Sequence, residues 1–316
     1  MCLEAVPDEL LLEIATYFPD FNQVMTPHMF RDNDPRRAKR KERQQALRAL
    51  SQTTRRLRAV FLPLAWAALD VNGMRLKIAL EDDYLHHQIL PCIQFLHIIL
   101  DLAHSDTIDV FLVFLHALPN IIGLHLRPER GAPCDTTSLR AALAAGSHTF
   151  PTIKVLNIPR SSPSPVFFAF PNVHTLTCDA IYMVPGDPAP GQPGQTSPLG
   201  AAVKAFRGLH SIAGIPLTPY AIRDLSQQFH NVRCLTTIGL VRVPPEELLA
   251  IFSGLPQLCE LSLCYLNTRP PSLEELIASG RAVLRASPST EKKVLFIWEY
   301  IPAMGFHLEP AYVGFV

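Results

Sequence analysis

A nine-position pattern of apolar and polar residues recurs along the chain and predicts a series of short β-strands. Each copy has a large apolar residue, a proline, a small polar residue, an aliphatic residue, two free positions, a leucine, one free position and an apolar residue. Four copies fit this template, at residues 118–126, 150–158, 170–178 and 255–263. Residues 206–212 and 229–235 are looser copies without the proline, and residues 93–98 keep only the strand part.

The proline and the alternating apolar residues explain how each strand would begin. Proline stops a preceding helix and fixes φ at a position that needs no donor for the sheet. The leucine and the apolar residue two positions later point to one face of the strand. Helix-like stretches lie upstream at residues 107–117, 138–145, 219–229 and 245–253. A helix followed by a strand cannot bury its own apolar faces, so the pattern predicts stacked units.

The spacing of these units resembles that of leucine-rich repeats. Central aliphatic residues at positions 96, 124, 156, 176, 212, 235 and 261 are 28, 32, 20, 36, 23 and 26 residues apart. Leucine-rich repeats have periods of roughly 20–29 residues. We expect an irregular α/β solenoid over residues 71–300, with loops at residues 160–165 and 184–200, which are rich in proline. The alternative is an ordinary α/β domain with coincidental Leu-Pro turns, which would show longer apolar strands and regular crossovers.

The first 70 residues predict a small helical module. Residues 6–18 favour a helix, because Pro7 suits a first turn and Asp8 and Glu9 lie at the positive end of the helix dipole. The polar residues of this helix form one narrow stripe, so its apolar arc is wide enough to cover more than one surface. Residues 46–60 predict a second helix. The polar stretch at residues 20–43 is interpreted as a loop or a disordered insertion.

The order of residues in this module is similar to the F-box motif. A Pro-x-Glu-Leu-Leu-x-x-Ile stretch is followed by an Arg-rich Leu-x-x-Val stretch and then by Pro-Leu-x-Trp-x-x-Leu. The positions that match the family are Pro7, Glu9, Leu10, Leu11, Ile14, Leu57, Pro63, Trp66 and Leu69. Val6, where leucine is usual, and the insertion between the helices depart from the family pattern. With repeats behind the module, the chain resembles fungal F-box proteins with C-terminal leucine-rich repeats, an α+β architecture.

This resemblance implies a role in a Skp/cullin/F-box (SCF) ubiquitin ligase. The module would dock on a Skp-type adaptor that links it to a cullin scaffold, and the repeats would hold a protein substrate. Two or three helices bury little apolar surface alone, which agrees with docking on a partner. Two alternatives stay open. The helices could only cap the array in a protein-binding scaffold without a ligase role, or the chain could be an enzyme with an unrecognised site.

Composition narrows the choice of partner and compartment. Hydrophobic residues make up 48% and charged residues 18%, so most of the chain can bury a core. Lys plus Arg and Asp plus Glu both number 28, so we expect no nucleic-acid or membrane partner. The basic run at residues 36–41 is interpreted as solvated rather than as a nuclear-import or nucleic-acid patch. Seven dispersed cysteines and a start without a secretory signal favour a reduced, cytoplasmic or nuclear protein.

Motifs for catalysis and metal binding are missing from the sequence, so we expect no enzyme activity, cofactor or metal. There is no P-loop, His-Glu-x-x-His, Gly-x-Ser-x-Gly or Cys-x-x-Cys. Asp32 and Asp34 lie among basic residues, which favours a solvated charge run over a magnesium site. Two His-Cys pairs supply too few converging ligands for zinc, namely His174 with Cys178 and His230 with Cys234.

Strand alternation predicts which residues line the concave face of the solenoid. The side chains between the inward aliphatic positions would face outward there and could contact a substrate. These candidates are His125, Arg127, Asn157, Thr175, Thr177, Asp179, Thr236, Glu260 and Ser262. The aromatic tail at residues 301–316 is expected to cap the last repeat.

Overall fold

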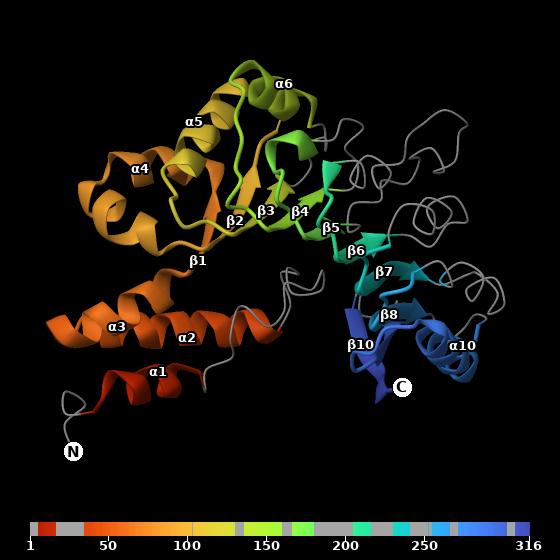
Figure 1. Ribbon diagram of the computed structural model, residues 1–316. Helices are drawn as coiled ribbons and strands as arrows, with labels where there is room; N and C mark the ends of the chain where they lie inside the picture. Colours follow the sequence, from red (N-terminus) through yellow and green to blue (C-terminus); the bar gives the residue numbers. More distant parts are fainter. Residues whose placement is uncertain are drawn as a thin grey trace. The chain divides into compact units, whose positions relative to one another are not determined.

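The computed structural model describes most of the chain (Figure 1). The described residues are 6–16, 35–102, 104–129, 136–159, 166–179, 205–215, 230–240, 252, 255–265, 271–301 and 307–316. They fall into two compact units, Met1–Pro133 and Cys134–Val316. The domain boundary expected near residue 70 lies inside the first unit and stays a prediction.

The first unit begins with three helices and continues with three parallel strands. Its helices are α1 (Asp8–Thr16), α2 (Pro35–Ser51), α3 (Arg55–Trp66), α4 (Leu76–Glu81) and α5 (Ser105–His116). Its strands are β1 (Ala68–Asn72), β2 (Phe95–Leu100) and β3 (Gly123–Pro128). Short helical turns η4 (Gly73–Arg75), η5 (Leu85–Ile89) and η6 (Leu90–Cys92) lie between β1 and β2. In Figure 1, α4 and α5 lie side by side near the strands, where they contact each other.

The second unit carries most of the strands. They are β4 (Val155–Pro159), β5 (Thr175–Asp179), β6 (Ser211–Ile215), β7 (Cys234–Leu240), β8 (Glu260–Tyr265), β9 (Val294–Ile301) and β10 (His307–Phe315). Its helices are α6 (Thr137–Ala145), the short η7 (Phe167–Ala169) and α10 (Leu273–Ala286). Strands β4 to β9 pair in parallel with their neighbours in chain order, and β10 runs antiparallel to β9 at the end.

Two predictions about the N-terminal helices are wrong. The stretch 46–60 is not one helix, because α2 ends at Ser51 and α3 starts after Thr54. Thr54 has extended backbone angles, and its hydroxyl accepts the N–H of Leu57 at 3.2 Å, which starts a new helix. Residues 35–43, predicted as part of a loop, form the first turns of α2. Pro35 suits a first turn and the following arginines and lysines are good helix formers.

Strand register confirms the central aliphatic positions of the repeat. Leu69 of β1 pairs with Leu96 of β2, which pairs with Leu124 of β3. In the second unit the same position joins Leu156, Leu176, Ile212, Leu235, Leu261 and Leu295. Leu96 is 1% exposed, and Leu124 and all six residues of the second unit are 0% exposed. The predicted period-two strands therefore bury the face that the sequence pattern marks.

A recurring turn precedes the strands and explains the apolar-proline template. The N–H of its aliphatic residue bonds to the carbonyl of the large apolar residue three positions earlier, as from Ile153 to Phe150 at 3.3 Å and from Leu258 to Leu255 at 3.2 Å. The same bond joins Ile93 to Leu90 at 3.2 Å. Residues 90–98 are therefore a further copy of the template, with Cys92 at the small polar position, which the sequence prediction recognised only in its strand part.

The helices predicted between the strands are confirmed where the structure describes them. Residues 107–117 correspond to α5 and residues 138–145 to α6. The predicted helices at residues 219–229 and 245–253 lie almost entirely outside the described residues, as do the predicted loops at 160–165 and 184–200. The fold class is thus mixed helix and strand with mostly parallel strand pairing, which is consistent with a leucine-rich-repeat-like architecture.

Candidate functional site

The three N-terminal helices enclose a hydrophobic core of their own. Its buried members come from all three helices: Leu11, Ala15, Leu47, Leu57, Phe61 and Ala65. Partly buried side chains packed against them are Val6, Leu50, Val60, Leu64 and Trp66. Every member of this cluster precedes β1. The module therefore satisfies its core without side chains from the strands.

Helix α1 leaves apolar side chains outside that core. Leu11 is 0% exposed, whereas Leu10 and Leu12 are 49% and 46% exposed. Because consecutive helical residues are about 100° apart, Leu10 and Leu12 flank the buried Leu11 on opposite sides of the helix. Water contacts these two leucines in the isolated chain, so a partner that covers them gains hydrophobic free energy.

Polar contacts hold α1 against α3. The guanidinium of Arg56 donates to Asp8 Oδ1 from Nη2 at 2.7 Å and from Nε at 3.0 Å, and to the carbonyl of Val6 at 2.6 Å. Asp8 lies in the first turn of α1, where a negative charge also suits the helix dipole. These contacts link the start of α1 to α3.

The residues matched to the F-box motif are divided between core and surface. Leu11 and Leu57 are buried, Trp66 and Leu69 are half-buried, and Pro7, Glu9, Leu10 and Pro63 are exposed. The side chain of Ile14 lies outside the described part of the structure. Trp66 is covered by the Arg48 guanidinium, whose Cζ lies 3.9 Å from the ring centre. Leu69 belongs to β1 rather than to a helix. Their role in docking stays a prediction.

On the predicted concave face, polar side chains stack from strand to strand. In the first unit, Asp70 Oδ1 lies 3.0 Å from His97 Nδ1, and the rings of His97 and His125 stack at 4.4 Å. In the second unit, Trp298 Nε1 donates to Ser262 Oγ at 2.7 Å. Neighbouring parallel strands bring such side chains to van der Waals distance, because strands lie about 4.8 Å apart.

Six of the nine concave-face candidates are buried within the chain. The buried ones are His125, Arg127, Asn157, Thr177, Thr236 and Ser262, at 0–8% exposure. Thr175 and Glu260 are half-buried, and the side chain of Asp179 is outside the described part. Other side chains of the chain cover these residues, as the stacked ring of His97 on His125 illustrates. Their contact with a substrate stays a prediction.

A row of basic side chains lies just before the strands of the second unit. The rings of His174 and His210 stack at 4.7 Å and 15°. Burial lowers the pKa of both imidazoles, and the positive charges nearby lower it further, from His210 and Lys154 on His174 and from Arg233 on His210. The sequence prediction considered His174 only as a metal ligand and missed this row. A basic or histidine residue immediately before each of several successive strands is the signal that could have found it.

The thiols near this row are poorly suited to nucleophilic chemistry. Burial, and the nearby Glu260 carboxylate after it, raises the pKa of Cys234 to about 12. Cys234 Sγ lies 3.9 Å from Glu260 Oε2. A thiol with so high a pKa holds its proton near neutral pH, and the thiolate is the nucleophile.

The described residues show neither a metal cluster nor a membrane-spanning helix. Among them, no three His, Cys, Asp or Glu side chains converge as metal ligands would. None of the helices described combines the length and the apolar character that crossing a membrane requires. The Asp32 and Asp34 pair lies outside the described part of the chain.

Comparisons with known proteins add little to this picture. No protein-family model matches the chain, and no curated protein matches it. Among solved structures, the chain is similar to the leucine-rich repeat-containing protein LegL7 from Legionella pneumophila, at 16% identity and a TM-score of 0.41. That alignment covers 79% of this chain and 80% of LegL7. The description of this protein as repeat-like therefore rests on the register of its own strands.

Proposed function

We propose that this protein is a substrate-recognition adaptor of an SCF-type ubiquitin ligase. In this proposal, helices α1–α3 dock on a Skp-type adaptor that is bound to a cullin scaffold, and the strand units hold a protein substrate. The protein itself is not an enzyme: it contributes proximity by holding the substrate close to the enzyme that transfers ubiquitin. The proposed role places it in the cytoplasm or the nucleus.

The observation that carries the proposal is the exposure of Leu10 and Leu12 beside a complete core. Both leucines keep nearly half of their surface in water, at 49% and 46%. Full burial of a leucine is worth about 1.5–3 kcal/mol, so covering the exposed halves of two leucines supplies a useful part of a binding energy. A groove on a partner is the usual receptor for such a helix.

The capping alternative predicts a different arrangement of α1. A cap turns its apolar side chains toward the first repeat. Here the apolar side chains of α1 that are buried, Leu11 and Ala15, join a cluster that draws no residue from β1, β2 or β3. This arrangement supports docking over capping.

One observation favours a scaffold without a ligase role. Trp66 stands at a position matched to the F-box motif, yet the guanidinium of Arg48 lies over its ring and the module's own core packs against it. A tryptophan engaged within the chain offers less surface to an adaptor. In the scaffold reading, α1–α3 are a structural start to the array, and protein binding by the strand units is the whole function.

Calorimetry with a purified Skp-type adaptor tests the proposal. The variants are Leu10→Asp with Leu12→Asp, and Val113→Asp as a matched control, because Val113 is 59% exposed on α5, away from α1. We expect the wild type and the control to bind alike. We expect the double variant to lose at least about tenfold in affinity, which corresponds to about 1.4 kcal/mol. Circular dichroism checks that all three chains are folded.

Two results would overturn the proposal. One is a double variant that binds the adaptor as tightly as the wild type. The other is a folded wild-type chain that does not bind the adaptor at all. That result would favour the alternative function, a protein-binding scaffold without a ligase role.

A further inference from the structure

Among the residues that the structure describes, strand β1 has a neighbouring strand on one edge only. Its residues Ala68–Asn72 pair in parallel with β2, from Phe95 opposite Ala68 to Ile99 opposite Asn72. In the described part of the chain, β1 is the terminal strand of the order. An edge of this kind presents backbone groups that can pair with another extended chain.

The hydrogen bonds around β1 show which way its backbone groups point. The carbonyl of Ala67 faces β2, because it accepts the N–H groups of Gln94 and Phe95, both at 2.8 Å. The next carbonyl, that of Ala68, faces the other way and accepts Gln44 Nε2 at 2.9 Å. Consecutive residues of a strand direct their backbone groups to opposite edges, so the groups of residues 70 and 72 point to the same side as that of Ala68.

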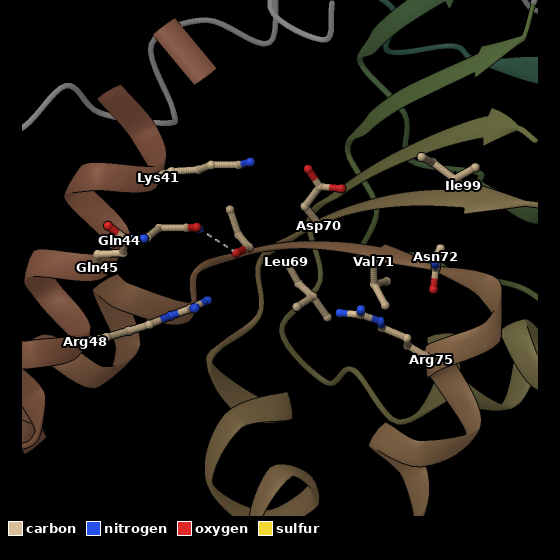
Figure 2. Close-up of a pocket in the computed structure, with 11 residues that line it drawn as sticks. Lys41, Gln44, Gln45, Arg48, Leu69, Asp70, Val71, Asn72, Arg75 and Ile99 are labelled. Carbon is tan, nitrogen blue, oxygen red and sulfur yellow. Dashed lines mark hydrogen bonds between the residues drawn. The ribbon is translucent and has the colours of Figure 1, made fainter. Parts of the chain in front are cut away.

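A cleft lies along this edge, between α2 and β1. Its volume is about 470 Å³, and Figure 2 shows Lys41, Gln44 and Arg48 extending from α2 toward β1. Arg75, on the turn after β1, also lines the cleft. Gln44 already donates its amide N–H to the strand edge, as the backbone of a neighbouring strand would do. The cleft is thus bounded by a strand edge that accepts amide donors.

The charges around this cleft are mostly positive. Lys41, Arg48 and Arg75 line it, and Asp70 is the acidic residue among the lining side chains. The Asp70 carboxylate lies 3.0 Å from His97 Nδ1, on the neighbouring strand. The guanidinium of Arg48 is held in place by its stacking on Trp66. Three cations along one strand edge complement a ligand with several carboxylates.

We propose that this cleft binds an extended acidic segment of another protein, which adds to β1 as a further strand. The backbone of the segment pairs with the outer edge of Ala68–Asn72 and takes the place of Gln44 at the Ala68 carbonyl. Its carboxylates lie against Lys41, Arg48 and Arg75. Five strand residues span about 17 Å, so a segment of similar length fills the site. This binding is independent of the proposed docking on a Skp-type adaptor, because it uses neither Leu10 nor Leu12.

The strand edge distinguishes this ligand from a nucleic acid. A single-stranded nucleic acid satisfies the three cations through its phosphates, but it has no row of amide groups with which to continue a sheet. An acidic peptide uses both the cations and the edge. Methylating the amide nitrogens of a peptide removes its strand pairing but keeps its charges, so it tests whether binding needs the strand edge as well as the cations.

Fluorescence anisotropy with the full chain tests the proposal. The probe is a labelled peptide of alternating Glu and Val, Glu-Val-Glu-Val-Glu-Val-Glu, at low ionic strength. Two further probes carry N-methyl groups on all Glu or on all Val nitrogens. In an added strand only alternate N–H groups face β1. We expect one N-methylated probe to bind at least about tenfold more weakly, because it loses backbone hydrogen bonds, and the other to bind like the parent.

The charge variants give the second arm of the test. Lys41→Gln with Arg75→Gln removes two cations from the cleft, and Arg55→Gln with Arg140→Gln removes two exposed cations elsewhere. We expect the first pair to weaken binding of the parent probe at least about tenfold, because two charge-assisted contacts to its carboxylates are lost. The control pair is expected to bind like the wild type.

Three outcomes would overturn the proposal. They are no binding of the parent probe, equal binding of all three peptides, and a labelled single-stranded oligonucleotide of equal charge that binds more tightly than the peptide and displaces it.

Discussion

The leucines of the strands and those of helix α1 differ in how far they are buried. At the central position of the strands, Leu176, Leu235 and Leu261 are all 0% exposed. In α1, only one of three consecutive leucines is buried, and Leu10 and Leu12 keep 49% and 46% of their surface in water. The apolar residues of the strand pattern are therefore buried within the chain, whereas two leucines of α1 keep about half of their surface in water.

The largest expected difference comes from the same substitution in both regions. Leu176→Ala leaves a cavity at a fully buried site, so we expect it to lower the free energy of unfolding by about 2–5 kcal/mol. Leu10→Ala at the half-exposed site should lower it by no more than about 1 kcal/mol. Urea unfolding followed by circular dichroism measures both. Equal losses would contradict the contrast, because they would mean that α1 is packed as tightly as the strands.

A glycine in β6 lies where two neighbouring strands approach each other closely. Gly214 has φ +84°, and a methyl group there would lie 1.8 Å from the carbonyl oxygen of Cys178 in β5. We expect Gly214→Ala to destabilise the second unit by about 1–3 kcal/mol or more. Gly208→Ala is the matched control, since its added methyl meets nothing within 4 Å. Thermal unfolding of both variants gives the comparison, and a Gly214 variant as stable as the control would refute this strand geometry.

The polar residue of the repeat template should contribute less. Asn172 Nδ2 donates to the carbonyl of Pro151, in the preceding copy of the template, at 2.9 Å. We expect Asn172→Ala to cost about 1 kcal/mol. Gln257 occupies the same template position, and the structure gives it no hydrogen bond within the described residues, so Gln257→Ala should be close to neutral. If urea unfolding shows a larger loss of stability for Gln257→Ala than for Asn172→Ala, the hydrogen bond between successive template copies does not explain the polar residue of the template.

The smallest expected effect is a pH dependence of the strand units. The pKa of His174 and of His210 is lowered in the folded chain, first by burial. Below about pH 6.5 the unfolded chain then binds more protons than the folded chain. Stability should therefore fall as the pH is lowered through that value. We expect His174→Gln with His210→Gln to flatten the profile of unfolding midpoint against pH, and an unchanged slope would exclude the pair as its source.

The sequence predicted most of the strands but missed two strands and the start of one helix. An alternating leucine and a preceding proline are local signals, and they placed the central residues of β2 to β8 in the correct register. Strands β1 and β9 were missed. Leu69 was assigned to the helical motif, and Leu295 has no proline turn before it. The first turns of α2 were missed because residues 35–41 are almost all polar, so apolar periodicity gives no signal there.

The candidate site was harder to predict than the fold. Strand alternation gives the face on which Thr177, Thr236 and Ser262 lie, but their burial depends on the side chains of the neighbouring strands. The cleft beside β1 depends on Gln44 and Arg48 lying next to a strand more than 20 residues later in the chain, as the bond from Gln44 to Ala68 shows with its separation of 24 residues. Such contacts follow from tertiary packing and not from a local pattern.

Hydrogen–deuterium exchange of the full chain, with and without a purified Skp-type adaptor, tests the central claim most directly. If α1 is a docking helix, saturating adaptor slows exchange of the amides in Asp8–Thr16, while strands β5 and β8 exchange as before. Exchange in α1 that saturating adaptor leaves unchanged, or protection confined to the strands, would contradict the claim that the bare leucines of this helix await a partner.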